Sequence, residues 1–258
     1  MTTVADQPIA TTTTGQHGGV ASARNRDMAA RTRARVAGIC YLITVAGSIP
    51  ALALERPVLS RAGFVLSNSA DTRLVLGGVL DLLTAVACVG TAVALYPLLR
   101  QRHPGLALGF VTSRVIEAAT IVISVVAILS LVTLHEAAAG ATGAERASLL
   151  VSGKLLVALH SWTFLLGPGL MPAINALLLG TVMFRTGLVP RIIAVIGLVG
   201  APLLIASATA TILGVYGQVS APAGLAALPV AAWELSLGLW LTIKGLQAKA
   251  VPGLASRR

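Results

Sequence analysis

The amino-acid sequence predicts an all-α protein of the polytopic transmembrane class, a bundle of six helices with both termini in the cytoplasm. Of its 258 residues, 56% are apolar and only 11% are charged, and the mean hydropathy is +0.87. Six apolar runs reach the roughly 20 residues that a helix needs to cross a hydrocarbon core. Basic residues gather on one side of the resulting crossings, as they do in membrane proteins. An ordinary soluble fold is therefore excluded.

The six predicted helices span, in chain order, residues 36–54, 74–99, 106–133, 148–184, 192–216 and 225–246. They make up one six-helix transmembrane domain over residues 34–247. Residues 1–33 are polar and lack apolar periodicity, which predicts a disordered cytoplasmic tail. Residues 248–258 are predicted to form a short basic cytoplasmic tail. The longest connection, residues 55–73, lies outside the cell in this topology.

The orientation follows from the distribution of lysine and arginine. With the N-terminus inside, 13 of these residues face the cytoplasm and 4 face the outside. Basic segments resist translocation, so this ratio favours six crossings of the bacterial cytoplasmic membrane with both termini inside. The cytoplasmic set is Arg24, Arg26, Arg31, Arg33, Arg35, Arg100, Arg102, Arg185, Arg191, Lys244, Lys249, Arg257 and Arg258, and the outer set is Arg56, Arg61, Arg73 and Arg146.

The fourth apolar run, residues 148–184, is too long for one straight crossing. It contains Gly167, Pro168 and Gly169 in succession. A proline inside a helix removes a backbone donor and clashes with the preceding turn. The sequence therefore predicts a helix break at these three residues.

Five ionisable residues inside the predicted helices are candidates for a buried polar cluster. They are Asp81, Arg114, Glu117, His160 and Glu234. A charge at the centre of a bilayer costs at least about 2.5–3.5 kcal/mol, so each is expected to find a partner or to lose its charge. Arg114 and Glu117, three residues apart on one helix, are expected to pair. We expect His160 to share a proton with Glu234 or Asp81.

This cluster has two main interpretations that the sequence leaves open. Every predicted helix carries a face of small and hydroxyl residues, which membrane helices use for close packing. The ionisable residues on these faces are then a structural network that fixes helix register, in a membrane component that binds a partner or a lipid. Alternatively they serve the passage of a small solute or of protons, with Glu117, His160 and Glu234 in the pathway. A third interpretation is an intramembrane hydrolase built on an acid–base pair.

No motif assigns catalytic chemistry. His135-Glu136 begins like a zinc-protease helix, but Ala139 stands where the second histidine is needed. Catalytic residues, a cofactor and a metal site are therefore not predicted. The net charge of +10 is spread over helix ends without an aromatic-studded basic face, so nucleic acid is not an expected partner. The expected partners are membrane lipids and a small-molecule ligand, and the oligomeric state is left open.

Several segments resemble one family of bacterial membrane proteins in their order and spacing. They are residues 35–44 (RVAGICYLIT), 94–100 (ALYPLLR), 113–117 (SRVIE), 159–169 (LHSWTFLLGPG) and 184–191 (FRTGLVPR). The family is domain of unknown function 4386, and the resemblance runs from about residue 33 to residue 244. It implies a multi-pass membrane fold of unassigned activity. By this resemblance the positions that the family pattern marks are Arg114, Glu117, His160, Arg185, Pro190 and Arg191, while Gly-Pro-Gly at 167–169 departs from it.

Overall fold

A computed structural model describes residues 14–59 and 71–247, and over these residues the chain is helical. The helices are α1 (Thr14–Leu59), α2 (Asp71–Leu99), α3 (Pro104–Ala138), α4 (Gly143–Leu166), α5 (Met171–Thr186), α6 (Arg191–Ile212) and α7 (Ala221–Ile243). Six spans in these ranges are long and apolar enough to cross a membrane, with α4 and α5 together forming the fourth. The predicted fold class, a multi-pass bundle of six crossings, is therefore confirmed.

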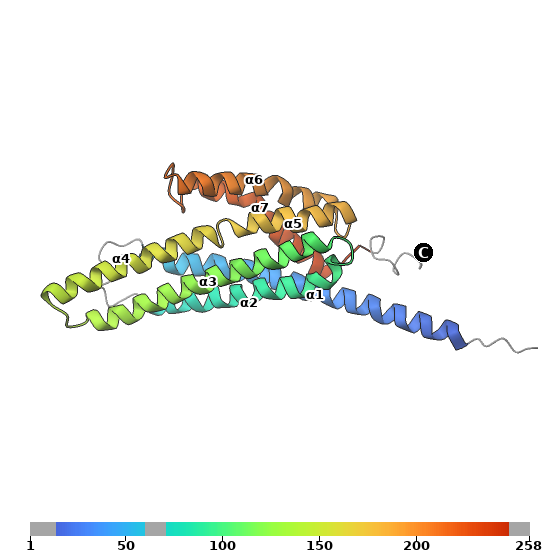
Figure 1. The fold of residues 1–258 in the computed structure, drawn as a ribbon, viewed down its shortest axis with the longest axis horizontal. Helices are drawn as coiled ribbons and strands as arrows, with labels where there is room; N and C mark the ends of the chain where they lie inside the picture. The colour runs from blue at the N-terminus through green and yellow to red at the C-terminus, as the bar shows by residue number, and fades with distance from the viewer. Residues whose placement is uncertain (1–13, 60–70, 248–258) are drawn as a thin grey trace, which may run out of the picture.

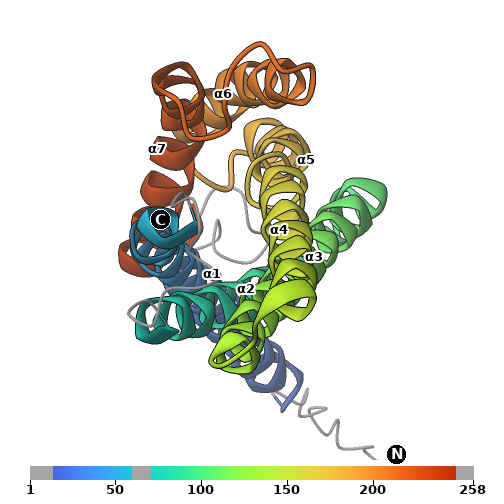
Figure 2. The same ribbon diagram turned by 90° about the vertical axis from the view of Figure 1, so that its left-hand side faces the viewer.

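The crossings form a ring that closes in chain order. Each of α1, α2 and α3 packs against the next, α3 packs against α4 and α5, and α5, α6 and α7 follow. The ring closes because α7 returns to α1. Seen along the bundle axis, α1 and α7 lie on one side of the centre, and α4 and α5 lie on the other (Figure 2). Residues from opposite sides of the ring therefore meet only at its centre.

The two ends of the bundle differ. The α2–α3 and α5–α6 connections lie at one end, called here the packed end, and the α3–α4 and α6–α7 connections lie at the other, the open end (Figure 1). The large apolar core includes Tyr41, Leu99, Phe110, Met183 and Trp233, all fully or almost fully buried. Toward the open end α4 packs chiefly against α3 alone. Apolar packing thus fills one half of the ring more completely than the other.

The N-terminal part of α1 differs from the sequence prediction. The helix begins at Thr14, so residues 14–33 lie in a helix where a disordered tail was expected. Residues 21–35 hold five alanines and five arginines, which are strong helix formers, and they continue a helix already nucleated by the first crossing. At its other end α1 reaches Leu59, which places Glu55 in the helix and not in the connection. The rest of the predicted N-terminal tail and the predicted tail 248–258 lie outside the described residues.

The predicted break in the fourth crossing falls between α4, which ends at Leu166, and α5, which begins at Met171. Gly167 donates its N–H to the carbonyl of Thr163 at 2.8 Å, and Gly169 donates to that of Phe164 at 2.9 Å. A Cβ at Gly167 would collide with the side chain of Thr120 on α3. The break therefore requires both a proline and a residue without a side chain at the α3 contact.

Glycines set the closest approach between α1 and α7. A Cβ on Gly38 would lie 2.6 Å from the backbone nitrogen of Thr242 and 2.7 Å from the carbonyl oxygen of Gly238. A Cβ on Gly238 would lie 3.1 Å from that of Tyr41. Lipid acyl chains are as apolar as the side chains, so the hydrophobic effect does not drive helices together in a bilayer. Helices there associate through such close backbone contacts instead. Gly38 and Gly238 thus fix the contact that closes the ring.

This contact predicts opposite effects for two substitutions of the same kind. We expect Gly38→Ala to destabilise the protein, because the new methyl group would meet backbone atoms of α7 and overpacking costs about 1–3 kcal/mol. We expect Gly105→Ala on α3 to be neutral or stabilising, since nothing lies within 4 Å of the place that its new methyl group would take and alanine favours helices over glycine by about 1 kcal/mol. Thermal unfolding of both purified variants in one detergent measures the difference. Equal melting temperatures would contradict the close α1–α7 contact.

Candidate functional site

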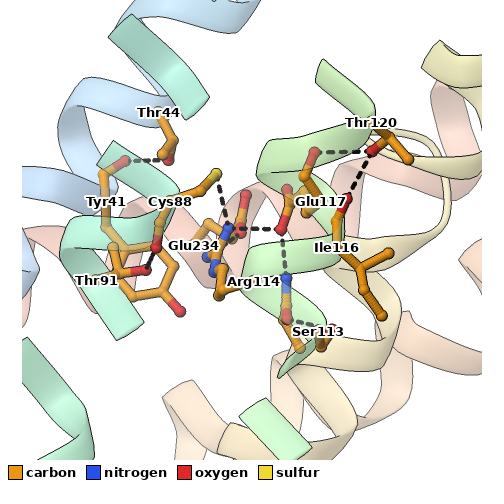
Figure 3. A network of polar contacts seen from close by, with 11 residues as sticks. Tyr41, Thr44, Cys88, Thr91, Ser113, Arg114, Ile116, Glu117, Thr120 and Glu234 are labelled. Carbon is orange, nitrogen blue, oxygen red and sulfur yellow. Dashed lines mark hydrogen bonds and ion pairs between the residues drawn. The ribbon is translucent and has the colours of Figure 1, made fainter. Parts of the chain in front are cut away.

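Arg114 on α3 is the centre of a buried ion-pair cluster. Its guanidinium donates to Glu117 Oε2 at 3.0 Å, one turn further along the same helix, and to Glu234 Oε1 of α7 at 2.9 Å (Figure 3). Arg114 is fully buried, and its side chain is 1% exposed against 13% for that of Glu234. The planar guanidinium offers several donors in a fixed geometry, which suits it to bridging two carboxylates. One cation thereby joins α3 to α7 across the ring.

Further hydrogen bonds extend this cluster to α5 and α2. Asn175 of α5 donates from Nδ2 to Glu117 Oε2 at 2.6 Å. Its Oδ1 accepts from the hydroxyl of Ser113 on α3 at 2.6 Å. Arg114 also contacts the sulfur of Cys88 on α2 at 3.6 Å (Figure 3). Helices from all sides of the ring therefore converge on one guanidinium and one carboxylate.

Aromatic rings pack against the guanidinium of Arg114. Its central carbon lies 4.7 Å from the ring centre of Tyr41 on α1 and 5.9 Å from that of Phe110 on α3. Trp233 of α7 packs edge-on against Tyr41, with ring centres 6.2 Å apart. Cation–π contacts of this kind strengthen when water is excluded. A layer of large rings thus packs against the cluster.

The cluster carries an excess of acid. One guanidinium faces two carboxylates, so with both ionised the three side chains hold a formal charge of −1 in a low-dielectric interior. Glu117 is engaged by both Arg114 and Asn175. Glu234 has only Arg114 among the described residues and is the more exposed of the two. The uncompensated charge is therefore assigned to Glu234.

Glu234 lies at the wall of a cavity on the side of the open end. The cavity has a volume of about 270 Å³ and is partly open to the surroundings. It lies among α1, the α4–α5 break, α6 and α7. Most of its lining is apolar, with Phe164, Pro172 and Leu204 among the larger side chains. Of the residues that the structure describes, Glu234 is the one ionisable group in this lining, so the cavity combines an apolar wall with a single acid.

A second polar cluster lies beside a second cavity of about 230 Å³. His160 of α4 has its Nδ1 2.6 Å from the hydroxyl oxygen of Ser124 on α3. Its Nε2 lies 3.9 Å from Glu55 Oε2 of α1. Glu55 and His160 both line this cavity. In the part of the chain that the structure describes, no group of three or more His, Cys, Asp or Glu side chains could hold a metal ion.

The α6–α7 connection covers both cavities. With its amide oriented so that both groups find a partner, Gln218 donates to the carbonyl of Ser161 at 3.1 Å and accepts from the N–H of Leu165 at 3.0 Å, both on α4. Arg56 of α1 donates to the carbonyl of Val219 at 3.2 Å. Gln218 and Val219 line both cavities, together with Leu52 and Phe164. The two cavities are therefore neighbours, and the α6–α7 connection that borders both is hydrogen-bonded to α1 and α4.

The structure brings together some of the residues predicted from sequence and separates others. Arg114 and Glu117 form the expected pair, and Glu234 joins them. The expected proton partner of His160 was wrong, because its neighbours are Ser124 and Glu55. Asp81 is buried on α2, apart from the Arg114 cluster. Helix spacing shows which face a residue occupies but not which helix lies opposite, and this is why the partner was missed.

Two residues of the site were absent from the sequence prediction. Glu55 was placed in a connection because the predicted first helix ended at residue 54. Asn175 was treated as part of an apolar run, although it is fully buried and bonds Glu117. A lone amide inside a membrane-spanning run is unfavourable unless it has a partner. That cost is a signal in the sequence that identifies Asn175 as a member of a polar network.

The fold and the buried clusters define a multi-pass integral membrane protein with ionisable groups at the centre of its helix bundle. The chain belongs to the family described as Domain of unknown function (DUF4386), whose sequence model matches residues 36–245. No curated protein and no solved structure matches the chain. The chemistry of the site must therefore be inferred from its own residues.

The Arg114 cluster predicts a stability effect with an internal control. We expect Arg114→Gln to destabilise the protein by about 3–5 kcal/mol, because it leaves two buried carboxylates without a cation. Adding Glu234→Gln removes one of these two charges, so the double variant should unfold at a higher temperature than the single one. Arg146→Gln, at an exposed position of α4, is the control for loss of one arginine. Thermal unfolding of the four proteins decides, and a loss no larger in Arg114→Gln than in Arg146→Gln would contradict the ion-pair assignment.

Proposed function

We propose that this protein binds a small, largely apolar solute carrying one positive charge, and passes it across the membrane through the centre of the bundle. The observation that carries the proposal is the Glu234 carboxylate, which shares its one cation, Arg114, with Glu117 and lines a mostly apolar cavity. A monocation in this cavity would neutralise the cluster of Arg114, Glu117 and Glu234. Without the solute, a proton on Glu234 serves the same purpose.

The dimensions of the cavity support a ligand of modest size. Ligand pockets for drug-sized molecules have volumes of about 300–1,000 Å³ and are lined mainly by apolar side chains with a few polar groups. A cavity of about 270 Å³ lies just below this range. Phe164, Pro172 and Leu204 offer an apolar wall, and Ser207 and Thr211 of α6 offer hydroxyl groups. An amine with a short hydrocarbon body fits this combination.

Passage rather than simple binding is supported by how the fold is divided. The cavity is partly open to the surroundings and borders the α6–α7 connection, while the rings of Tyr41 and Trp233 pack edge-on beside the Arg114 cluster and outside the cavity lining. The crossing beside the cavity is broken at residues 167–170. Transporters bind solutes near the membrane midplane beside discontinuous helices of this kind. If both termini are cytoplasmic, as the basic residues favour, the cavity lies in the outer half of the bundle.

A hydrolase is less well supported by the same geometry. Ser124, His160 and Glu55 include the residue types of a catalytic triad. However, Ser124 is 2% exposed and lines neither cavity. It also lies in the middle of α3, where backbone amides are engaged in helix hydrogen bonds and do not form an oxyanion site. We therefore favour solute binding over hydrolysis.

The proposal predicts ligand selectivity by charge. We expect benzylammonium to raise the melting temperature of the purified protein more than benzyl alcohol, which has nearly the same shape without the charge. Binding to the folded state alone stabilises it by mass action. The preference should be lost in Glu234→Gln, since the amide keeps the hydrogen bond to Arg114 but not the charge. Glu145→Gln, at an exposed position at the start of α4, should behave as the wild type.

Flux measurements separate passage from binding. Vesicles reconstituted with the protein should take up labelled benzylammonium faster than empty vesicles, and Glu234→Gln should abolish the difference. Selective stabilisation without any flux would support the alternative interpretation, a membrane component that binds a ligand or partner but does not transport it. Equal stabilisation by benzylammonium and benzyl alcohol, in the wild type as in Glu234→Gln, would contradict a cation site at Glu234.

A further inference from the structure

The second cavity holds a buried acid–histidine pair, Glu55 and His160. Glu55 is 1% exposed and His160 is 6% exposed, so both are removed from water. Among the residues that the structure describes, no lysine or arginine forms an ion pair with Glu55. This differs from the first cavity, where Arg114 holds two carboxylates. The charge of the second cluster therefore depends on how many protons it carries.

One oxygen of Glu55 has no hydrogen-bond partner within the described part of the chain. Oε1 is buried and unpaired, and it packs over Gly77 of α2, where a Cβ would lie only 2.6 Å from it. Asp81 lies one turn further along α2 on the same face as Gly77 and is also buried. An unpaired carboxylate oxygen in a low-dielectric interior is costly. A proton on this carboxyl group removes most of that cost.

The groups that face the pair come from every helix packed around it. α2 contributes Asp81, and α3 contributes the neutral hydroxyl of Ser124, with His135 three turns further along the same helix. On α1, Arg56 lines the same cavity, and its guanidinium donates to the carbonyl of Val219 at 3.2 Å. On α4, Lys154 is exposed, and the α6–α7 connection contributes the neutral Gln218. Over residues 14–59 and 71–247, the immediate surroundings thus add a further acid, while the permanent cation in the cavity wall, Arg56, is exposed and bonded to the carbonyl of Val219.

The contacts of His160 are compatible with both the neutral and the protonated imidazole. A serine hydroxyl either donates to a neutral imidazole nitrogen or accepts from a protonated one. The 2.6 Å contact with Ser124 is therefore retained in both states of His160. The other ring nitrogen lies 3.9 Å from Glu55, too far for a hydrogen bond but close enough for an ion pair if the imidazole gains a proton. The neighbouring cavity leaves room for this distance to change.

From these contacts we infer that Glu55 and His160 form a proton-binding site that is distinct from the Arg114 cluster. The bound proton resides either on a carboxyl oxygen of Glu55 or on Nε2 of His160, and the buried Asp81 of α2 adds negative potential that retains it. The site exchanges this proton through the second cavity. It requires no further ligand, so it stands whether or not a solute binds beside Glu234.

A consequence for transport rests on the proposed function. The two cavities share Leu52, Phe164, Gln218 and Val219 in their walls, so a cation in one lies next to the proton site of the other. Like charges repel strongly in a medium of low dielectric constant. Binding of a monocation beside Glu234 should therefore expel the proton from Glu55 and His160. The protein would then exchange protons for its cationic solute.

The proton site is tested without any solute by nuclear magnetic resonance of labelled protein in detergent. We expect the imidazole nitrogens of His160 and the carboxyl carbon of Glu55 to shift between about pH 4 and about pH 9, a range that spans the ordinary titration of both groups. His160→Gln and Glu55→Gln assign the two signals. Glu55→Gln should move the titration midpoint of His160, while Glu136→Gln, at an exposed position of α3, should leave it unchanged.

Two outcomes would overturn the inference. One is that neither signal shifts over this range. The other is that His160 titrates identically in the wild type and in Glu55→Gln, which would show an isolated histidine. If Glu55→Gln does not fold, Ser124→Ala provides the second variant. It leaves both titrating groups in place but removes the hydroxyl from Nδ1, so the midpoints of His160 and Glu55 should move together, and movement of one alone would also overturn a shared proton.

The coupling is tested separately with benzylammonium. Displacement of one proton per bound cation should strengthen binding with rising pH by up to about tenfold per pH unit below the titration of the pair. Glu55→Gln should flatten this dependence while benzylammonium still binds. Failure of benzylammonium to bind at any pH would count against the solute site at Glu234 and leave the resonance result standing. Binding with the same pH dependence in Glu55→Gln would contradict the coupling.

Discussion

The bundle depends on the cost of burying one guanidinium. Arg114 sits where neither water nor headgroups reach it, so it must be neutralised by carboxylates held at the same depth. Glu117 comes from the next turn of α3, but Glu234 comes from the last helix of the bundle. The pair can form only if α7 returns to face α3 across the ring. This requirement fixes the rotation and depth of α7, which an apolar contact between helices in lipid would specify only weakly.

The same interaction divides the bundle into two functional halves. Around the guanidinium, Tyr41, Phe110 and Trp233 are fully buried, and Gly38 and Gly238 bring α1 and α7 into backbone contact. Toward the open end the fourth crossing breaks and α4 leaves the ring for α3, so side chains no longer fill the centre. Tight packing is therefore found around the large rings and the α1–α7 contact, and the cavities are found beside Glu234 and Glu55. Both cavities follow from this change in packing.

Hydrophobicity and local spacing determine the part of this structure that is predictable from sequence. Six crossings, the break at Gly-Pro-Gly and the pairing of Arg114 with Glu117 each depend on residues close together in the chain. The partners of Glu234 and His160 depend on which faces oppose each other and at what depth, and an error of a few residues in a helix end changes both. Glu55 shows this sensitivity, because it directly follows the first predicted helix, which ended at residue 54. The helical N-terminal segment was missed for a different reason, since its polarity concealed its alanine and arginine content.

The two clusters differ in a way that assigns them different roles. Around Arg114 the cation is permanent. Only Glu234, the carboxylate that faces the cavity, can therefore change the charge of this cluster. The charges of Glu55 and His160 are both conditional on a proton, and the permanent charge of Arg56 in the same cavity wall is bonded to the carbonyl of Val219. A network that served only to hold helices in register would gain nothing from conditional charges, because each change of protonation would alter its stability. Groups that change charge beside a cavity of about 230 Å³ are instead suited to respond to a molecule or ion that enters it. Because the two cavities share a wall, this response takes place next to the solute site.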